Sequence, residues 1–232
     1  MKSMLIFGGS GSIGQAIATA ASKVGYLVVL ADIKEPCDGD DFEYIATDAT
    51  CEAQVKKAVL FTLERTGKLD VVVNCQGEYK VDRIEKTSVD ELDKLLEVNL
   101  KSVFLVCKSA VPILKWQKNG YIINVASMAG LRGKRGETAY CASKFAVVGL
   151  TDALFAELQG SGVRVTAICP SSVQTPFVEK SVKLSETDKA KILQPEDIAG
   201  VVIELVSSSP RMMRKVVPIE IEGDIDKLEK MK

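Results

Sequence analysis

The amino-acid sequence predicts an α/β fold in three layers, in which a mostly parallel sheet of about seven strands lies between two layers of helices. Short apolar runs alternate with longer segments of helical spacing along the 232 residues, and this alternation is typical of parallel strands joined by helices. The run from Leu69 to Asn74 is apolar over most of its length, as a central strand covered on both faces requires. No internal repeat or linker-like stretch divides the chain. We therefore expect one domain over residues 1–232.

The expected strands are short, and a loop or turn follows each of them. They cover Met4–Phe7, Leu27–Ala31, Glu43–Ala46, Leu69–Asn74, Tyr121–Ala126, Val163–Cys169 and Val216–Ile221. The expected helices cover Gln15–Val24, Glu52–Arg65, Ser88–Lys115, Tyr140–Leu158 and a segment that begins at Pro195. Pro112 should bend or interrupt the last turn of the third helix, because proline has no N–H to donate. We expect residues 177–194 to cover a substrate and residues 224–232 to form a charged surface tail.

Composition excludes several classes of function. The chain has 30 basic and 31 acidic residues and a net charge of −1, which gives no reason to expect nucleic-acid or membrane-surface binding. It lacks the roughly 20-residue apolar run of a membrane span, and its first residues enter a strand without a signal-peptide pattern. We therefore expect a cytoplasmic protein. The absence of histidine and of any Cys-x-x-Cys pair argues against a metal site and against a histidine-based triad.

A glycine-rich loop follows the first strand and opens the first helix. It reads Gly8-Gly-Ser-Gly-Ser-Ile-Gly14, and glycines at such a junction let the backbone approach a pyrophosphate at the helix N-terminus. Asp32 ends the second strand, 18 positions after Gly14, close to the ~20 expected for the acid that binds the adenosine ribose. The alternative is an ordinary turn with a solvated aspartate. The pattern favours a doubly wound, Rossmann-like dinucleotide site, with candidate residues Gly8, Ser10, Gly11, Ser12, Ile13, Gly14 and Asp32.

A tyrosine, a lysine and a serine form the candidate catalytic group. Tyr140 and Lys144 are four residues apart and would share one face of a helix. A nearby ammonium group favours the phenolate and lowers the pKa of a tyrosine. Ser127 follows an expected strand at the sheet edge where ligands bind, and its hydroxyl can hold a substrate oxygen. The alternative for the pair is an amphipathic surface; together with the dinucleotide site, the pattern favours proton transfer to or from an alcohol or ketone.

From Met4 to about Val206 the chain resembles the short-chain dehydrogenase/reductase family in several ordered motifs. The glycine loop resembles the family's cofactor loop, and Asp48 resembles its adenine-contacting acid. The segment from Asn74 to Gly77 is similar to its Asn-Asn-Ala-Gly segment, so both residues are expected to contact the cofactor. The segment that follows the sixth strand is similar as well. It adds three expected cofactor contacts, Pro170, Val173 and Thr175, with Thr175 at the nicotinamide carboxamide.

The resemblance also implies four catalytic roles. Tyr140 is expected to be the general acid/base. Lys144 is expected to lower the pKa of Tyr140 and to bind the nicotinamide ribose, which makes both residues cofactor contacts. Ser127 is expected to orient the substrate oxygen, and Asn99 to position a water molecule that relays protons. The chain departs from the family pattern at Phe7, Ser12, Cys75, Gln76 and Ser171.

Two classes of function remain open at this point. The first is an NAD(H)-dependent oxidoreductase that interconverts a secondary alcohol and a ketone, such as a 3-hydroxyacyl/3-oxoacyl compound or another small hydroxy compound. The second is a catalytically silent dinucleotide sensor or scaffold protein, which normally lacks one member of the tyrosine, lysine and serine group. Lysines in residues 177–192 can meet an anionic substrate, although such a run is more often a solvated helix face.

Cofactor choice and assembly complete the expectations. Asp32 favours NAD over NADP, because a 2′-phosphate would face its carboxylate. The family resemblance implies a homodimer or homotetramer built on the helices that carry Asn99 and Tyr140. The first of these helices offers apolar side chains for the interface, unless they all face the sheet; they are Val103, Phe104, Val106 and Ala110.

Overall fold

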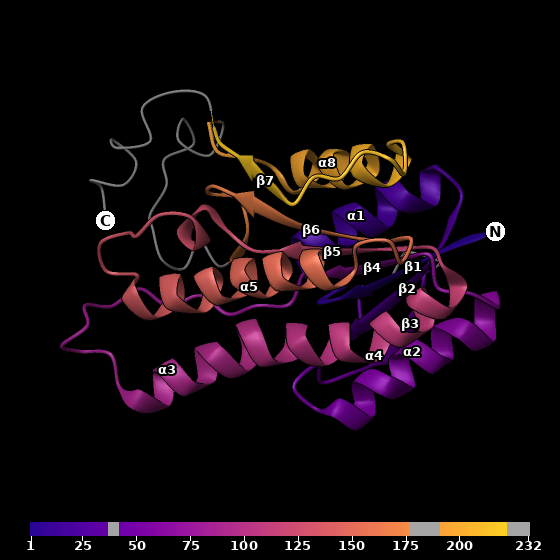
Figure 1. The fold of residues 1–232 in the computed structure, drawn as a ribbon. Helices are drawn as coiled ribbons and strands as arrows, with labels where there is room; N and C mark the ends of the chain where they lie inside the picture. Colours follow the sequence, from indigo (N-terminus) through magenta and orange to yellow (C-terminus); the bar gives the residue numbers. More distant parts are fainter. Residues whose placement is uncertain (37–41, 177–190, 222–232) are drawn as a thin grey trace.

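The computed structural model describes residues 1–36, 42–176 and 191–221. Within them, seven parallel strands form one sheet in the order β3-β2-β1-β4-β5-β6-β7, with helices on both faces (Figure 1). The strands are β1 Lys2–Phe7, β2 Tyr26–Asp32, β3 Glu43–Ala46, β4 Val71–Asn74, β5 Gly120–Val125, β6 Val163–Pro170 and β7 Val216–Ile219. The order reverses between β1 and β4, and such a switch point is where doubly wound sheets bind ligands.

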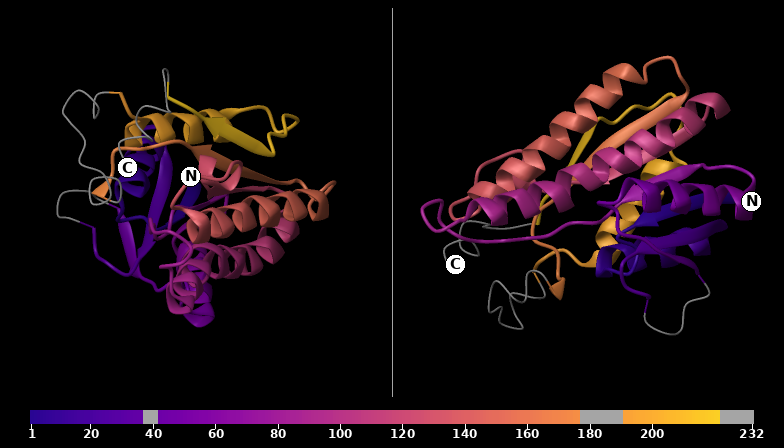
Figure 2. Two further views of the ribbon diagram at one scale, coloured as in Figure 1. Left: turned by 90° about the vertical axis from the view of Figure 1, so that its left-hand side faces the viewer. Right: turned by 90° about the horizontal axis from the view of Figure 1, so that it is seen from below.

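Two layers of helices cover this sheet. The helices are α1 Ser12–Lys23, α2 Glu52–Thr66, α3 Val89–Leu96, the π-helical turn η1 Glu97–Lys101, α4 Ser102–Gln117, the 3₁₀ turn η2 Met128–Gly130, α5 Thr138–Glu157 and α8 Pro195–Ser207. Helices α1 and α8 lie together on one face, and α2, α4 and α5 lie on the other (Figures 1 and 2). The predicted α/β class and the mostly parallel sheet of seven strands are therefore confirmed.

The side chains of the strands alternate between two apolar clusters, one under each layer of helices. In β1, Leu5 and Phe7 pack with α2, α4 and α5, while Met4 and Ile6 pack with α1 and α8. All four are fully buried, because neighbouring residues in a strand point to opposite faces and both faces are covered. This burial on both sides explains why the central strands are almost uniformly apolar in sequence.

The helical segment after Ser88 runs from Val89 to Gln117 and contains a π-helical turn that was not expected. It begins with the predicted capping box, in which Glu91 N donates to Ser88 Oγ at 3.1 Å and Ser88 N donates to Glu91 Oε2 at 3.0 Å. The turn η1 then separates α3 from α4. The prediction that Pro112 interrupts the last turn is wrong, since α4 continues to Gln117; a bend at this position stays a prediction. Pro112 is exposed, so water can satisfy the carbonyl of Lys108 that lacks its usual donor.

The apolar residues expected at a subunit interface lie mostly in the core. Val103, Val106 and Ala110 are at most 3% exposed and pack toward the sheet. Phe104 alone of the four is half exposed. Of the four residues expected at an interface, only Phe104 is therefore exposed enough to contact another subunit. A helix that covers a sheet turns most of its apolar residues inward.

The end of the expected substrate-covering segment 177–194 joins the loop after β6. Leu193 N donates to Ser172 O at 3.1 Å, and Gln174 N donates to Leu193 O at 2.7 Å. The rest of this segment, residues 177–190, and the expected charged tail 224–232 lie outside the described residues.

Candidate active site

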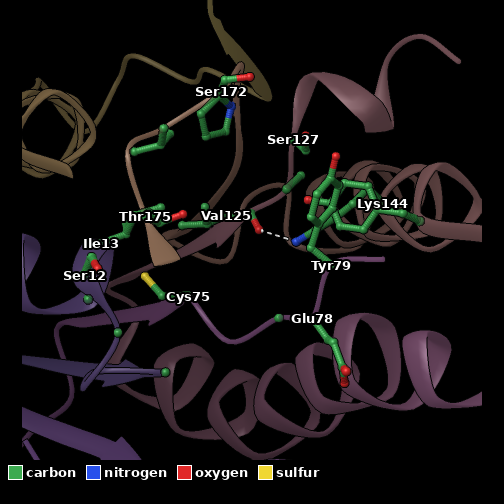
Figure 3. Close-up of a pocket in the computed structure, with 18 of the residues that line it drawn as sticks. Ser12, Ile13, Cys75, Glu78, Tyr79, Val125, Ser127, Lys144, Ser172 and Thr175 are labelled. Carbon is green, nitrogen blue, oxygen red and sulfur yellow. Dashed lines mark hydrogen bonds between the residues drawn. The ribbon is translucent and has the colours of Figure 1, made fainter. Parts of the chain in front are cut away.

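A pocket of about 300 Å³ opens at the carboxyl ends of the central strands, at the switch point between β1 and β4 (Figure 3). Its wall combines the glycine loop, the end of β4, the end of β5, the start of α5 and the loop after β6. Thirteen predicted site residues line it, namely Gly8, Ser10, Gly11, Ser12, Ile13, Gly14, Gly77, Ser127, Tyr140, Lys144, Pro170, Val173 and Thr175. Asp32, Asp48, Asn74 and Asn99 do not line it within the described part of the chain.

The glycine loop packs too closely for larger residues at two positions. Gly8 has φ +70°, and a Cβ there would lie 2.5 Å from Gln76 N. A Cβ on Gly14 would lie 2.5 Å from Gly8 O. Both glycines are therefore required for the loop to turn directly into α1. This turn leaves the N-terminus of α1 facing the pocket, where backbone N–H groups attract phosphate.

Asp32 ties the glycine loop to the turn after β2. Its Oδ2 accepts from Ser10 N at 3.0 Å, and its Oδ1 accepts from Lys34 N at 3.1 Å. Ser10 Oγ closes the link by donating to Lys34 O at 2.6 Å. The carboxylate is thus held at the end of the loop, next to the pocket but outside its lining.

Asp48 and Asn74 have environments other than direct pocket contact. Asp48 Oδ1 accepts from the N–H and the hydroxyl of Thr50 at 2.9 and 2.7 Å. Asn74 is 1% exposed; its amide donates to Asn124 Oδ1 at 2.8 Å and accepts from Gln76 at 3.2 Å. The side chain of Asn74 therefore joins β4 to β5, and its expected contact with the cofactor stays a prediction. Gln76, a departure from the family pattern, completes this buried amide network.

Asn99 lies in the turn η1 and joins three segments of the site. Its Oδ1 accepts from Glu78 N at 2.7 Å, and its Nδ2 donates to Glu78 O and to Ser143 Oγ, each at 2.9 Å. Gly77 passes beside it, and a Cβ there would lie 3.2 Å from Asn99 Oδ1 and 3.5 Å from Lys144 Nζ. Asn99 therefore sits behind the pocket wall, close to the ammonium of Lys144.

Ser127, Tyr140 and Lys144 come together as the sequence predicts. Ser127 is positioned at the end of β5, where its Oγ accepts from Ala129 N at 3.1 Å. Lys144 Nζ donates to Val125 O at 3.2 Å and lies 5.8 Å from the centroid of the Tyr140 ring. Figure 3 shows this lysine bond and Ser127 on the same side of the pocket.

The pKa values of this group differ from the simple expectation. Burial raises the pKa of Tyr140, whereas an interaction with the Ser127 hydroxyl lowers it. Burial also lowers the pKa of Lys144 to about 8. The expected lowering of the tyrosine pKa by Lys144 is therefore corrected to a net rise, because both groups are removed from water and the ammonium bonds to a backbone carbonyl.

Comparison with known proteins shows the family. The family model for short chain dehydrogenases matches residues 2–185. The chain belongs to the short-chain dehydrogenase family. It is therefore an oxidoreductase of the kind that interconverts CH–OH and C=O groups, and its family binds a nicotinamide dinucleotide.

Relatives and solved structures agree with this assignment. The short-chain dehydrogenase is 33% identical to an uncharacterized oxidoreductase of Staphylococcus aureus, over 87% of this chain and 89% of that protein. It is also 33% identical to a 3-oxoacyl-(acyl-carrier-protein) reductase of Thermotoga maritima, over 97% of each. Among solved structures, it is similar to levodione reductase (30% identity, TM-score 0.85, 94% and 95% covered). It is similar too to the aldohexose dehydrogenase of Thermoplasma acidophilum (26% identity, TM-score 0.87, 94% and 92% covered).

The structure adds residues of this short-chain dehydrogenase that sequence reasoning missed. Glu137 and Tyr79 line the pocket beside Tyr140, and Tyr79 Oη donates to Glu137 Oε1 at 2.7 Å. The sequence signal for Glu137 was its closeness to Tyr140, three residues along the chain. Cys75 also lines the pocket, and burial raises the pKa of its thiol to about 12. The thiol therefore stays protonated and unreactive near neutral pH.

Helix α5 of the short-chain dehydrogenase is long and apolar enough to cross a membrane by length and composition alone. Its residues Tyr140, Lys144 and Val147 face the pocket and the core beside the sheet, so we interpret it as a packed helix. Only 28% of its most apolar window is buried. The outer face of α5 is therefore apolar and open, as Phe145, 46% exposed, illustrates.

Proposed function

We propose that this short-chain dehydrogenase is an NAD(H)-dependent enzyme that interconverts a secondary alcohol and a ketone, with Tyr140 as the general acid/base. The observation that carries this proposal is that Tyr140, Ser127 and Lys144 line the same pocket as the glycine loop, with Lys144 Nζ 5.8 Å from the centroid of the Tyr140 ring. A silent sensor has no need for this arrangement. We propose the cytoplasm as its location.

The residues divide the work of proton transfer. In ketone reduction, Tyr140 donates its phenolic proton to the carbonyl oxygen, while the Ser127 hydroxyl holds the same oxygen. The nicotinamide, when bound, supplies the hydride. Because the pKa of Tyr140 is raised, the phenol is the neutral acid that this step needs near pH 7. The charge of Lys144 then stabilises the phenolate that remains.

Lys144 and Asn99 assist Tyr140 without contacting the reacting carbonyl group. Lys144 carries its charge below its pKa of about 8 and also lines the part of the pocket in which a nicotinamide ribose would lie. Asn99 lies near Lys144 Nζ, at the segment from Gly77 to Glu78. We infer that it helps to hold the water through which the proton of Tyr140 is replaced.

The backbone of the glycine loop and the loop after β6 would hold the dinucleotide. Ser12, Ile13 and Gly14 line the pocket at the start of α1, where the backbone N–H groups of a helix N-terminus favour a pyrophosphate. Pro170, Val173 and Thr175, in the segment after β6, line the same pocket and would meet the nicotinamide. Asp48, whose Oδ1 is taken up by Thr50, is proposed to contact the adenine from outside the described pocket.

A preference for NADH over NADPH is expected from Asp32. Its carboxylate is held in place by two backbone N–H groups, so a 2′-phosphate would face it at close range. At an effective dielectric constant near 20 the repulsion is roughly 4 kcal/mol at 4 Å; screening leaves about 1–3 kcal/mol, or a ten- to hundredfold difference in Kd. Titration of both reduced cofactors, followed by NAD(P)H fluorescence, measures this ratio.

Two substitutions of Asp32 distinguish the effect of its negative charge from the effect of its hydrogen bonds to the glycine loop. Asp32→Ala should narrow the gap between the cofactors but also release Ser10 N and Lys34 N. Asp32→Asn removes the charge and keeps one acceptor, so it should narrow the gap with less loss of NADH affinity. Tighter binding of NADPH than NADH by the unaltered protein would contradict the assignment.

Two substrate classes are compatible with this function, and one observation favours each of them. The relative from Thermotoga maritima is a 3-oxoacyl-(acyl-carrier-protein) reductase, which favours a 3-oxoacyl or 3-hydroxyacyl compound. A small hydroxy compound is the alternative, favoured by the polar wall near Glu137 and Tyr79. Oxidation of NADH measured against 3-oxoacyl thioesters and small ketones tests the function. Failure to turn over any of them while NADH binds would favour the sensor.

A homodimer or homotetramer is proposed through the outer faces of α4 and α5. Exposed apolar side chains remain there, with Phe104 50% and Phe145 46% exposed. Light scattering at micromolar concentration should show a particle of at least twice the chain mass of 25.1 kDa. Phe104→Glu with Phe145→Glu should shift it toward the monomer, because charges are costly at a buried interface. A 25.1 kDa particle for the unaltered chain would exclude the oligomer.

A further inference from the structure

The pocket wall beyond Tyr140 holds a buried carboxylate that the proposed proton transfer does not use. Glu137 is 4% exposed and lines the pocket. It stands just before α5, three residues before Tyr140, and both side chains line the pocket. Glutamate is almost never buried without donors around it. Glu137 therefore marks a place in the pocket where hydrogen-bond donors are favoured.

Tyr79 orients this carboxylate and connects it to the acid/base. Its hydroxyl donates to Glu137 Oε1 at 2.7 Å. Its ring meets the ring of Tyr140 edge-on, with centroids 4.7 Å apart and an interplanar angle of 84°. The chain before Tyr79 is held in turn by Asn99, which bonds both backbone groups of Glu78. Glu137, Tyr79 and Tyr140 thus contact one another in sequence, and we refer to these three residues as the row.

This row lies on the substrate side of the pocket. The glycine loop occupies the opposite wall, where the dinucleotide is proposed to bind; Figure 3 shows Ser12 and Ile13 there, away from Tyr79 and Ser127. A ketone whose oxygen meets Tyr140 and Ser127 would therefore extend toward Tyr79 and Glu137. The chemistry of these two side chains then selects what the rest of the substrate can be.

Two other charged residues line the same wall, and both are less suited to this selection. Glu78 Oε1 accepts from Lys94 Nζ at 2.7 Å, and Figure 3 shows its side chain turned away from Ser127 and Lys144. Lys134 lines the pocket as well but is only half-buried. Glu137 is the charged group of this wall that combines burial with an orienting bond next to Tyr140.

We propose that Glu137 recognises a hydroxyl group of the substrate, and that the substrate is a hydroxyketone or the corresponding diol. This inference rests on the proposed function, because it requires the reacting carbon to lie at Tyr140. A hydroxyl on a neighbouring carbon donates to the carboxylate of Glu137, which can accept several hydrogen bonds at once. Such a bond to an ionised group is about twice as strong as one between neutral groups.

The same carboxylate disfavours two other substrate classes. A keto acid would bring a second negative charge against Glu137 in a site largely removed from water. A 3-oxoacyl thioester would present a carbonyl oxygen, an acceptor facing an acceptor, and would leave a buried polar group poorly matched. The hydroxyketone supplies the donor that both of these lack.

A matched pair of ketones tests the proposal with the full-length protein and NADH. Acetoin and butanone differ by one hydroxyl, and acetoacetate serves as the carboxylate case. The unaltered enzyme should favour acetoin over butanone by about tenfold or more in kcat/KM, because a site built to bind a hydroxyl rejects the analogue without it. Acetoacetate should be the poorest of the three.

Substitutions at Glu137 and Tyr79 should lower the preference for acetoin over butanone to different extents. Glu137→Gln keeps an acceptor for Tyr79 and removes the charge; it should reduce the acetoin preference about tenfold, to near parity with butanone, and leave the Kd for NADH unchanged. Tyr79→Phe should reduce the preference by a smaller factor, since it removes only the orienting bond. Glu157→Gln, at an exposed carboxylate at the far end of α5, is the matched control and should leave the preference unchanged.

The results distinguish this proposal from the function on which it rests. An equal loss on acetoin and butanone in Glu137→Gln, or an unaltered preference, would overturn the role of Glu137. Binding of both ketones to the Tyr140→Phe protein loaded with NADH, followed by NADH fluorescence, gives a readout without turnover. There, tighter binding of acetoin that disappears in Tyr140→Phe/Glu137→Gln supports the proposal, and equal binding overturns it. Absence of turnover with every ketone would contradict the proposed reaction instead.

Discussion

Replacing Tyr140 with phenylalanine is expected to lower kcat by at least ~10²–10⁴, the usual contribution of a positioned proton donor. The variant keeps the ring that packs edge-on against Tyr79, so the shape of the pocket should be preserved. NADH should still bind with nearly its original Kd, because the glycine loop and the loop after β6 are unchanged. Steady-state kinetics with a reducible ketone and an NADH titration measure both quantities.

A second tyrosine supplies the control for that experiment. Tyr26 lies at the beginning of β2, at the edge of the sheet opposite the carboxyl ends that form the pocket. Tyr26→Phe should therefore leave kcat within a factor of about two, since it removes a hydroxyl far from the site. Near-normal turnover in Tyr140→Phe would remove Tyr140 from the mechanism.

Replacing Lys144 with methionine is expected to produce the second largest loss. Lys144 is 5% exposed, and its ammonium bonds to Val125 O and lies 5.8 Å from the centroid of the Tyr140 ring. In the proposed mechanism its charge stabilises the phenolate of Tyr140. Its removal should lower kcat by about 10²–10³, as loss of one preorganised electrostatic group does. The KM for NADH should rise as well, because the same side chain lines the proposed ribose site. Steady-state kinetics with NADH as the varied substrate measure both.

The pH dependence of the reduction rate distinguishes a charged lysine that acts in the reaction from a lysine with a structural role only. Burial lowers the pKa of Lys144 to about 8, so the group is charged below that value and neutral above it. The rate of ketone reduction should fall as the pH rises through about 8, and Lys144→Met should lack this decrease. An unchanged profile in the variant would show that another group sets it. Lys23→Met, at an exposed residue at the end of α1, should reproduce the unaltered profile.

Local patterns predicted much of the fold. The strand, glycine loop and helix from β1 to α1 follow from residues that are neighbours in sequence, because glycine conformation and strand apolarity are local properties. The pairing of Tyr140 with Lys144 follows from helix geometry alone. The position of Ser127 at the end of β5 follows from the rule that ligands bind at the carboxyl ends of parallel strands.

Features that depend on distant contacts were missed or misplaced. The turn η1 around Asn99 is stabilised by bonds to Glu78 and Ser143, which are separated from it in sequence by 21 and 44 positions. Asn74 turns toward Asn124 rather than toward the pocket. No periodicity carries this information, since a side chain chooses its direction from partners that only the packed sheet brings near.

The sequence by itself determined the fold class, the position of the glycine loop and the grouping of Ser127, Tyr140 and Lys144. Only the tertiary structure decided the electrostatics of that group, because the pKa values of Tyr140 and Lys144 depend on burial. It also placed Tyr79 against Tyr140 and Glu137 against Tyr79. Tyr79 comes from the loop after β4 and Glu137 from the start of α5, so their meeting exists only once the sheet and α5 have packed together.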